Sequence, residues 1–379
     1  MASKCERNGN GRFVLRDVCS PGGRGGEVSE LAFSADGNHI LMGTKSFAVR
    51  VWGTNSGEVE LFAPPLAGSN DDGGYHAGHL SCDVVLSPSR GLIMPAGSAT
   101  GGVIVWDCMD GGCRTADLRN NGHEYGSCVA HVAAYPDGRY FVSADLTTMK
   151  VWSTDDFQCK RTIRNTLEVQ ILVVSSKSRY IFCAGDSTNP KRGVVTVWSG
   201  SGKREETAVG CRGSDAKPVR LLQGHGNSIR SLYAPDDPGK QASNVLVTTS
   251  VDGRAKVWDV PSGVCTRTVW STGGTPSTFS YAALVNHGTW LLTSCGDGSL
   301  QVWGLETGKC LLTLPGRAAP AAKTPCLRVA VSRCGRLVAF ATGCRVQVID
   351  FDKLADRSGA GQPGNPGAYL LHALRFITL

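Results

Sequence analysis

The stretch SVDGRAKVWDVPSGVC, residues 250–265, holds a turn, a Val-Trp-Asp triplet, a second turn and a cysteine. The stretch could be a chemical site formed by Asp252, Trp258, Asp259 and Cys265. It could also be one copy of a repeated structural unit, in which these side chains serve packing. The choice depends on whether the same pattern recurs along the chain, because a repeat places its residues for packing rather than for chemistry.

The Val-Trp pair of this stretch does recur, at a nearly constant interval. The successive intervals are 54, 46, 46, 60, 45 and 46 residues, and Ile349 takes the tryptophan position in a seventh copy. The repeat tryptophans are Trp52, Trp106, Trp152, Trp198, Trp258 and Trp303. We therefore expect seven copies of one structural unit.

Each interval consists of short strand-like runs. In the third interval the runs CVAHVAAY, YFVSA and MKVWS alternate with the turns PDGR and DLTT. Runs of β-branched, aromatic and aliphatic residues between Gly, Pro, Asp and Asn predict strands, and Asp-Gly pairs predict tight hairpins because glycine tolerates a positive φ. A further strand after each Trp-containing run gives four strands per interval. Four strands in about 40–45 residues predict the blade of a β-propeller.

The fifth copy resembles a WD repeat. Its segments GHGNSIRSLYAP (224–235) and LVTTSVDGRAKVWDVPSG (246–263) are similar to the pattern of that family, including the Gly-His pair. The resemblance implies a hydrogen-bonded tetrad made of His225, Ser250 or Thr248, Asp252 and Trp258. Such a role is physically reasonable, because a buried imidazole, carboxylate and indole N–H are costly unless they satisfy one another.

The other copies depart from the family pattern. The third keeps Gly122 and His123, but Asp145 lies one position out of register, and the sixth keeps Asp297 without a Gly-His pair. We therefore expect most blades to be held by apolar packing alone.

Cys265 lies seven residues after Trp258, and three other cysteines share this offset: Cys113, Cys159 and Cys310. Equivalent positions of different blades lie in different sectors of a ring, so these thiols cannot meet in a disulfide or a metal cluster. We expect them to act as small, half-buried hydrophobic residues. The opening stretch is thus interpreted as structural.

The ends of the chain determine the predicted domain organisation. The seventh copy lacks a fourth strand, and the N-terminal run RFVLRDV (12–18) is the best candidate to supply it and close the ring. The prediction is an all-β, seven-bladed β-propeller of four antiparallel strands per blade over residues 12–351. Outside the propeller we expect a disordered N-terminus (1–11), a Gly/Pro-rich linker (352–367) and an apolar C-terminal segment (368–379).

Composition fits this class. The 379 residues are 41% hydrophobic and 19% charged, with 48 glycines for many turns. Fifteen cysteines without a C-x-x-C motif, and no apolar N-terminal run, predict a reducing intracellular compartment, either cytoplasm or nucleus. No apolar run approaches the roughly 18 residues of a membrane span, so no membrane contact is expected.

Motifs for chemistry are weak. His76, His79 and Cys82 have ligand-like spacing but no evident fourth ligand, and SGSGKREE (199–206) lacks the first glycine of a phosphate loop. Without a catalytic signature, we expect no enzyme activity, no metal, no cofactor and no small-molecule substrate.

Function is therefore expected in the loops, which rigid repeats present to partners. The two longest intervals carry residues 201–220, with a basic excess, and residues 63–79, with an aromatic side chain. The candidate partner-binding residues are Lys203, Arg204, Arg212, Lys217, Arg220, Lys191, Arg192 and Tyr75. Because inter-blade loops and second turns open on the same face of a propeller, these basic residues could converge there. The alternative for residues 201–220 is a solvated, disordered loop.

Two functions follow. The favoured one is a non-catalytic scaffold that mediates protein–protein interactions in a multi-subunit intracellular complex. The alternative is an RNA- or chromatin-associated subunit that binds phosphates through a basic loop face. The formal charge of +7 is mild for this length and also suits an acidic partner.

Overall fold

The computed structural model describes the strands of the chain and most of the tight turns between them. The described residues are 5–8, 12–15, 28–34, 37–44, 49–54, 59–63, 85–87, 91–97, 102–107, 114–118, 123, 129–164, 169–175, 177, 179–185, 193–200, 217–235, 244–270, 279–285, 288–296, 299–314, 328–342 and 345–350.

These residues form antiparallel sheets, six of four strands and one of five. The four-stranded sheets of the N-terminal half contain β3 (Val28–Phe33), β4 (His39–Thr44), β5 (Val49–Gly53) and β6 (Val59–Ala63); β7 (Val85–Ser87), β8 (Gly91–Gly97), β9 (Val103–Asp107) and β10 (Arg114–Asp117); and β11 (His131–Ala134), β12 (Tyr140–Ala144), β13 (Thr148–Ser153) and β14 (Cys159–Arg164). Those of the C-terminal half contain β15 (Ile171–Val174), β16 (Tyr180–Ala184), β17 (Val195–Ser199) and β18 (Arg220–Leu222); β19 (Ile229–Tyr233), β20 (Val245–Ser250), β21 (Arg254–Asp259) and β22 (Val264–Trp270); and β23 (Phe279–Val285), β24 (Trp290–Cys295), β25 (Leu300–Gly304) and β26 (Cys310–Leu314).

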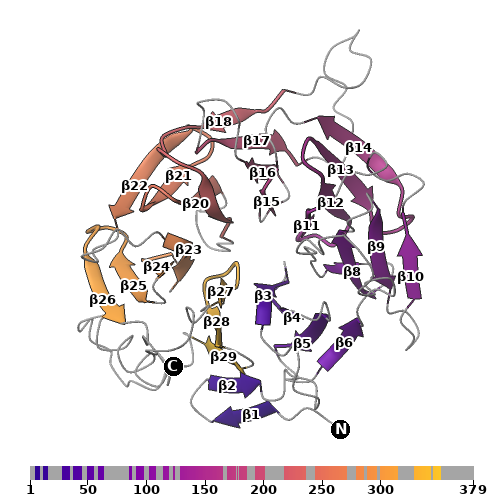
Figure 1. The fold of residues 1–379 in the computed structure, drawn as a ribbon, viewed down its shortest axis with the longest axis horizontal. Coiled ribbons are helices and arrows are strands. Elements are labelled where there is room, and N and C mark those ends of the chain that lie inside the picture. Colours follow the sequence, from indigo (N-terminus) through magenta and orange to yellow (C-terminus); the bar gives the residue numbers. More distant parts are fainter. Residues whose placement is uncertain are drawn as a thin grey trace, which may run out of the picture.

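Within each four-stranded sheet the strands pair in chain order, so the first and fourth strands lie at its two edges. Figure 1 shows the sheets following one another around a common centre, with first strands such as β15 and β27 inside and fourth strands such as β22 and β26 at the rim. This arrangement of four-stranded antiparallel blades is that of a β-propeller, as the repeat predicts.

The five-stranded sheet joins the two ends of the described chain. It contains β1 (Cys5–Asn8), β2 (Arg12–Leu15), β29 (Arg345–Asp350), β28 (Leu337–Thr342) and β27 (Arg328–Val331), in that order. β2 pairs antiparallel with β29, Arg12 opposite Ile349, so the predicted N-terminal strand does lie beside the last repeat. The prediction of disorder over 1–11 is wrong for Cys5–Asn8, because these residues pair with β2 as a hairpin and extend the sheet by one strand.

Tight turns link neighbouring strands as the Asp-Gly pairs predict. Gly138 and Gly253 have φ values of 71° and 76°, a left-handed conformation that strains any residue with a Cβ. Asp137 precedes Gly138, and its carboxylate accepts a hydrogen bond from the Arg139 amide at 3.1 Å. The Asx-type contact and the glycine together fix this hairpin.

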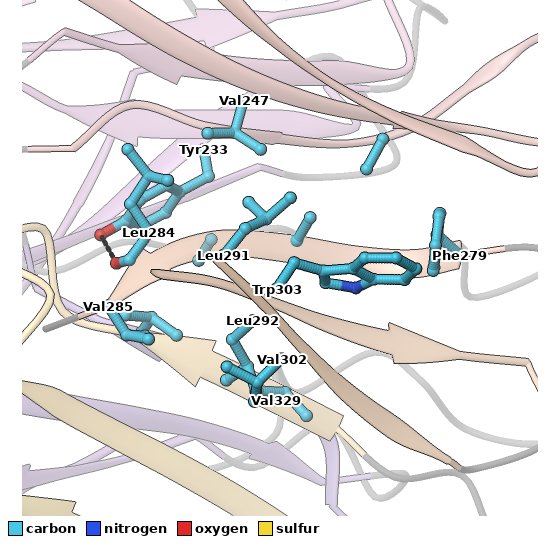
Figure 2. Close-up of a cluster of buried hydrophobic side chains, with 14 of the residues drawn as sticks. Tyr233, Val247, Phe279, Leu284, Val285, Leu291, Leu292, Val302, Trp303 and Val329 are labelled. Atoms are coloured by element: carbon cyan, nitrogen blue, oxygen red, sulfur yellow. Dashed lines mark hydrogen bonds between the residues drawn. The ribbon is translucent and has the colours of Figure 1, made fainter. Parts of the chain in front are cut away.

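The core lies between adjacent sheets. Its largest described cluster joins the β19–β22, β23–β26 and β27–β29 parts of the fold and includes Val247, Leu292, Val302 and Val329. Figure 2 shows these side chains around Trp303, whose ring meets the edge of another aromatic, Phe279, at a centroid distance of 6.4 Å. These three sheets therefore bury their apolar faces by stacking on one another, as repeat architectures require.

Arginines on outer strands connect neighbouring sheets in a regular way. The Arg161 guanidinium on β14 donates to the Ser199 carbonyl at the end of β17, at 2.9 Å. Arg220 on β18 donates to the carbonyl of Ser262, in the turn before β22, at 3.3 Å. Arg267 on β22 donates to the carbonyls of Leu305 and Glu306, in the turn before β26, at 2.9 and 3.1 Å. We call these three arginines, with the four hydrogen bonds that they donate, the arginine braces.

The repeat cysteines lie at β-bulges. Cys159, Cys265 and Cys310 each pair with the repeat tryptophan of the third strand, at the point where the register shifts. Each thiol is half-buried and contacts the threonine three residues later, with Sγ–Oγ1 distances of 3.7, 3.4 and 3.4 Å. These three thiols are free, as the repeat argument predicts. Cys113 lies outside the described residues.

Candidate functional site

The β19–β22 sheet contains a relay of buried hydrogen bonds. The Trp258 indole N–H donates to Thr248 Oγ1 at 2.9 Å, and Thr248 Oγ1 lies 2.7 Å from His225 Nε2. The other imidazole nitrogen, Nδ1, lies 3.0 Å from Asp252 Oδ2. Asp252 Oδ2 also accepts a hydrogen bond from the Gly226 amide at 2.8 Å. The relay fixes the segment before β19 to the turn between β20 and β21.

Thr248, and not Ser250, links the imidazole to the indole. Side chains alternate between the two faces of a strand, so both residues lie on the same face of β20. Trp258 pairs with Leu246, so Thr248 is two residues from that pair and Ser250 is four, and Thr248 is the nearer of the two to the indole. The Ser250 hydroxyl instead donates to the Asn227 carbonyl at 2.8 Å and accepts from the Asp252 amide at 3.1 Å. Ser250 thus supports the turn, and its assignment to the tetrad is wrong.

The β11–β14 sheet contains an equivalent relay that the sequence did not predict. Trp152 Nε1 donates to Ser143 Oγ at 2.8 Å, His123 Nε2 lies 2.8 Å from the same oxygen, and His123 Nδ1 lies 2.8 Å from Asp145 Oδ2. The last pair before the turn is Ala144 with Met149 in this sheet and Thr249 with Ala255 in the other, so one residue fewer lies between the paired residues here. A carboxylate one position further from the repeat tryptophan therefore reaches the imidazole. Apolar packing alone, which we expected of most blades, therefore does not describe this one.

Two other repeat tryptophans make partial versions of the relay. Trp303 Nε1 donates to Thr293 Oγ1 at 3.1 Å, and Trp198 Nε1 donates to Thr196 Oγ1 at 3.0 Å. Trp52 is fully buried, and its indole nitrogen has no hydrogen-bond partner in the described part of the chain. The Trp106 side chain lies outside the described residues. Trp52, Trp198 and Trp303 are therefore core residues of the repeat.

Electrostatics keeps the β19–β22 relay in one protonation state. Burial lowers the pKa of His225, against the opposing pull of Asp252, so the imidazole is neutral at pH 7. Burial of the Asp252 carboxyl opposes ionisation, but the Gly226 amide and His225 outweigh it and hold the pKa of Asp252 below its ordinary value. Every partner in the relay is committed to another, which leaves no group free for chemistry.

Strand direction divides the loops between two faces of the propeller. Because β19 to β22 alternate in direction, the His225 segment and the β20–β21 turn lie at one face, which we call the His–Asp face. The turns between first and second strands and between third and fourth strands lie at the other, which we call the opposite face.

The long basic segment is inserted between a third strand and a fourth strand. Residues 201–216 lie outside the described residues, but they connect β17, which ends at Ser199, with β18, which begins at Arg220. They therefore leave and rejoin the sheet at the opposite face. Lys191 and Arg192 precede β17, in the turn that reaches the His–Asp face. These basic residues lie outside the described residues, so their convergence stays a prediction; β17 runs between the two points at which their segments join the sheet.

The turn that contains Lys191 and Arg192 is fixed at its end by a close backbone approach. A Cβ on Gly193 would lie 2.6 Å from the Asn227 carbonyl oxygen and 2.7 Å from the Cβ of His225, and its φ of 75° also favours glycine. The end of this turn thus packs directly on the His225 segment of the next sheet. Lys191 and Arg192 themselves, like Lys203, Arg204, Arg212 and Tyr75, lie outside the described residues.

The described end of the basic segment combines a cation with exposed apolar side chains. Lys217 is exposed, and Val219 and Leu221 are 56% and 44% exposed although their neighbour Leu222 is fully buried. Arg220 is also exposed but braces the next sheet through Ser262. Neither apolar side chain was a sequence-based candidate. Their position in an edge strand that begins after an insertion was the signal that could have indicated them.

The described residues contain no cluster of three or more His, Cys, Asp or Glu side chains arranged to hold a metal ion. No helix in the described part of the chain is both long and apolar enough to cross a membrane.

Comparison with known proteins finds a family model, "WD domain, G-beta repeat", that matches residues 116–153 and 216–259. Autophagy-related protein 16 of Arabidopsis thaliana is 25% identical over 54% of this chain and 35% of its own. Nuclear distribution protein nudF of Aspergillus niger is 24% identical over 45% of this chain and 33% of its own. The chain thus spans about a third of the length of these two relatives. Nuclear distribution protein PAC1 of Arthroderma benhamiae is 22% identical over 80% of this chain and 64% of its own.

The four-stranded blades and the buried relays define a β-propeller of the repeat type. Both relays lie within the two segments that the family model matches. The chain therefore contains repeats of the WD type in the two segments that the family model matches.

Proposed function

We propose that this chain is a non-catalytic scaffold that holds other proteins together in a multi-subunit complex. The propeller over residues 12–351 would act as one closed ring of seven blades, with β2 as the strand that closes it. The relatives named above for autophagy and nuclear distribution support a role in assemblies, but at this identity and coverage their partners remain theirs.

The observation that carries the proposal is the exposed edge at Lys217–Leu221, on the opposite face. Val219 and Leu221 face solvent. Pairing of Arg220–Leu222 with β17 and the Arg220 brace hold this strand in place beside them. Pre-ordered apolar side chains beside a cation suit a protein ligand, because little conformational entropy is lost on binding. A nucleic-acid ligand would instead require a cluster of cations with few apolar contacts.

Pull-down from native cells with quantitative mass spectrometry tests this assignment. One variant deletes residues 203–216, and a second replaces Val219 and Leu221 with serine; both should keep the thermal midpoint and lose at least one partner. Arg164→Ala, on the exposed edge of β14, is the matched control. An unchanged partner set in both variants would contradict the proposal.

Salt distinguishes the alternative of an RNA or chromatin partner. Phosphate contacts make affinity fall steeply with ionic strength, by about three orders of magnitude or more between 50 and 200 mM salt for six contacts. An apolar-anchored protein contact at Val219 and Leu221 should change far less. Partner retention in washes of rising salt, with and without nuclease, provides the measurement.

A further inference from the structure

The β19–β22 sheet carries a second exposed feature, at its rim on the His–Asp face. Trp270, the last residue of β22, is 59% exposed. It is one of the two tryptophans of the sequence that lie outside the repeat register. It pairs across the strands with Arg254, the first residue of β21. A large, exposed indole beside a guanidinium is the kind of anchor that dominates protein-interaction energetics.

The other repeats show that the fold does not require this pair. The position four residues before the repeat tryptophan holds Arg254 here, and Thr148, Val194 and Ser299 in three other sheets. The residue opposite Thr148 on β14 is Arg164, where β22 has Trp270. Features common to all repeats serve the fold, so an aromatic–cation pair present in one blade requires another explanation.

The outer edge of β22 is open to strand addition. β22 has seven residues, more than any other described fourth strand, and no described strand pairs with its outer side. Figure 1 shows it at the rim of the propeller. Proteins usually protect such edges with charges, and β14 carries Lys160, Arg161 and Arg164. The single charged residue of β22, Arg267, is turned toward the β25–β26 turn.

A β-bulge limits where a new strand could pair. The register of β21 and β22 shifts between Val257 and Trp258, opposite Thr266, and a bulge bends the strand locally. From Arg267 to Trp270 the register is regular again. The half of β22 that ends at Trp270 is therefore the part that can accept a partner strand.

Charge selects the partner. Arg254, Lys256 and Arg267 lie on or next to this half of β22. Lys256 contacts the Thr268 hydroxyl at 3.1 Å, the Cys265 sulfur at 3.9 Å and the Trp258 ring, and among the described residues no carboxylate pairs with it. Asp252 is committed to His225 and Gly226. Acidic side chains on an added strand would lie within about 10 Å of these cations, since strands are spaced about 4.8 Å apart.

We propose that the Trp270 half of β22, backed by Arg254, binds an extended acidic segment of a partner protein as a fifth strand of this sheet. Main-chain pairing supplies affinity, and Trp270 with the cations supplies selectivity. The site rests on the proposed scaffold function in that its ligand is a protein. It lies at the His–Asp face, away from the Lys217–Leu221 edge, so the two sites can fail separately.

Fluorescence polarisation with a labelled, end-capped peptide that alternates glutamate and valine tests the site on the full chain. Wild type should bind it, and Trp270→Ala and Arg254→Gln should each weaken binding about tenfold or more. Arg164→Ala, the equivalent position on β14, should leave binding unchanged. Replacing the glutamates with lysine should abolish binding. Only every second backbone amide of the bound peptide would point toward β22, because amides alternate in direction along a strand. N-methylation of the amides that face β22 should therefore abolish binding, and N-methylation of the other amides should not.

Two results would overturn the proposal. One is equal binding of the glutamate peptide by wild type and by Trp270→Ala, or no binding by wild type at all. The other is concentration-dependent dimerisation in sedimentation that Trp270→Ala removes, which would identify a second copy of this chain as the occupant. The variants at residues 203–216, 219 and 221 should bind the peptide normally, and this separates failure here from failure of the scaffold proposal.

Discussion

The hydroxyl of Tyr233 donates to the carbonyl of Ser332 at 2.8 Å, although the two residues are 99 positions apart. The same hydroxyl lies 3.3 Å from the Leu284 carbonyl and 3.2 Å from that of Arg333. One side chain at the end of β19 thus contacts the next sheet at Leu284 and the one after it at Ser332 (Figure 2 shows the contact to Leu284).

Removing this hydroxyl should weaken the whole fold. Tyr233→Phe keeps the ring in the core but leaves buried carbonyls without a donor, so the free energy of unfolding should fall by about 1–2 kcal/mol. Urea denaturation with an unchanged m-value is the measurement. Tyr140→Phe, on a partly exposed tyrosine of β12, is the control, and an equal loss in both variants would show that Tyr233 has no special role.

Thr248 and Ser250 should differ in importance although they are two residues apart. Thr248→Val leaves the His225 and Trp258 ring nitrogens without their shared partner, which should lower the free energy of unfolding by about 2–3 kcal/mol. Ser250→Ala removes only the turn contacts and should cost about 1 kcal/mol. Denaturant unfolding of both variants decides the matter. The reverse order would mean that Ser250 is the tetrad residue after all.

Trp258→Ala should be the most damaging single change in the β19–β22 sheet. It opens a cavity in the core and removes the indole donor to Thr248, with an expected loss of about 3–5 kcal/mol. Calorimetry should show a lower midpoint for the entire transition. A variant that unfolds like wild type would contradict the structural role of the repeat tryptophan.

Acid should destabilise the protein through His131 at the start of β11. Burial lowers the pKa of His131 from its ordinary 6.5 to about 4, so the unfolded chain binds this proton more readily than the folded one. The stability is complete above pH 6.5 and is lost as the pH falls toward 4. Between pH 7 and pH 5 this site should remove about 2 kcal/mol.

His131→Gln removes that titration and should flatten the decline in unfolding free energy over this range. His225, whose pKa burial also lowers, stays in place in the variant and accounts for part of the remaining decline. An identical pH dependence in wild type and variant would show that His131 is not the titrating group.

The two chain ends should respond differently to truncation. Deleting residues 1–15 removes β1 and β2 and exposes the edge of β29, so cooperative unfolding and solubility should be lost. Deleting residues 360–379 should leave the melting transition unchanged. Circular dichroism melts of both proteins test this, and the opposite pattern would assign the closing role to the C-terminal segment.

Much of the fold was predictable because a repeat reports the same structure many times. The interval of 46 residues between Trp106, Trp152 and Trp198 predicted four strands for each repeat. The N-terminal strand was predicted because the last repeat lacked a strand to pair with β29. The strand at Cys5–Asn8 was missed, because a four-residue hairpin arm has little pattern of its own.

The candidate site was less predictable, because it depends on where loops leave the sheet. Placing residues 201–216 required knowing that Arg220–Leu222 is a fourth strand, and three residues are too few for a periodic signal. The Asp145 relay was missed because the shortened turn moves the aspartate one position in the sequence relative to the repeat tryptophan. The carboxylate still reaches the histidine in the structure. The exposure of Trp270 depends on which side chains lie next to it on neighbouring strands, and the spacing of residues in the sequence does not identify them.

The arginine braces have a consequence for how this protein can change over time. Each of them ends on a main-chain carbonyl, at Ser199, Ser262, Leu305 or Glu306, and every amino acid supplies that acceptor. Mutations in these turns therefore leave neighbouring sheets joined as long as the chain follows the same path. The turns are free to diverge, or to receive grafted sequences, without separating the neighbouring sheets that they connect.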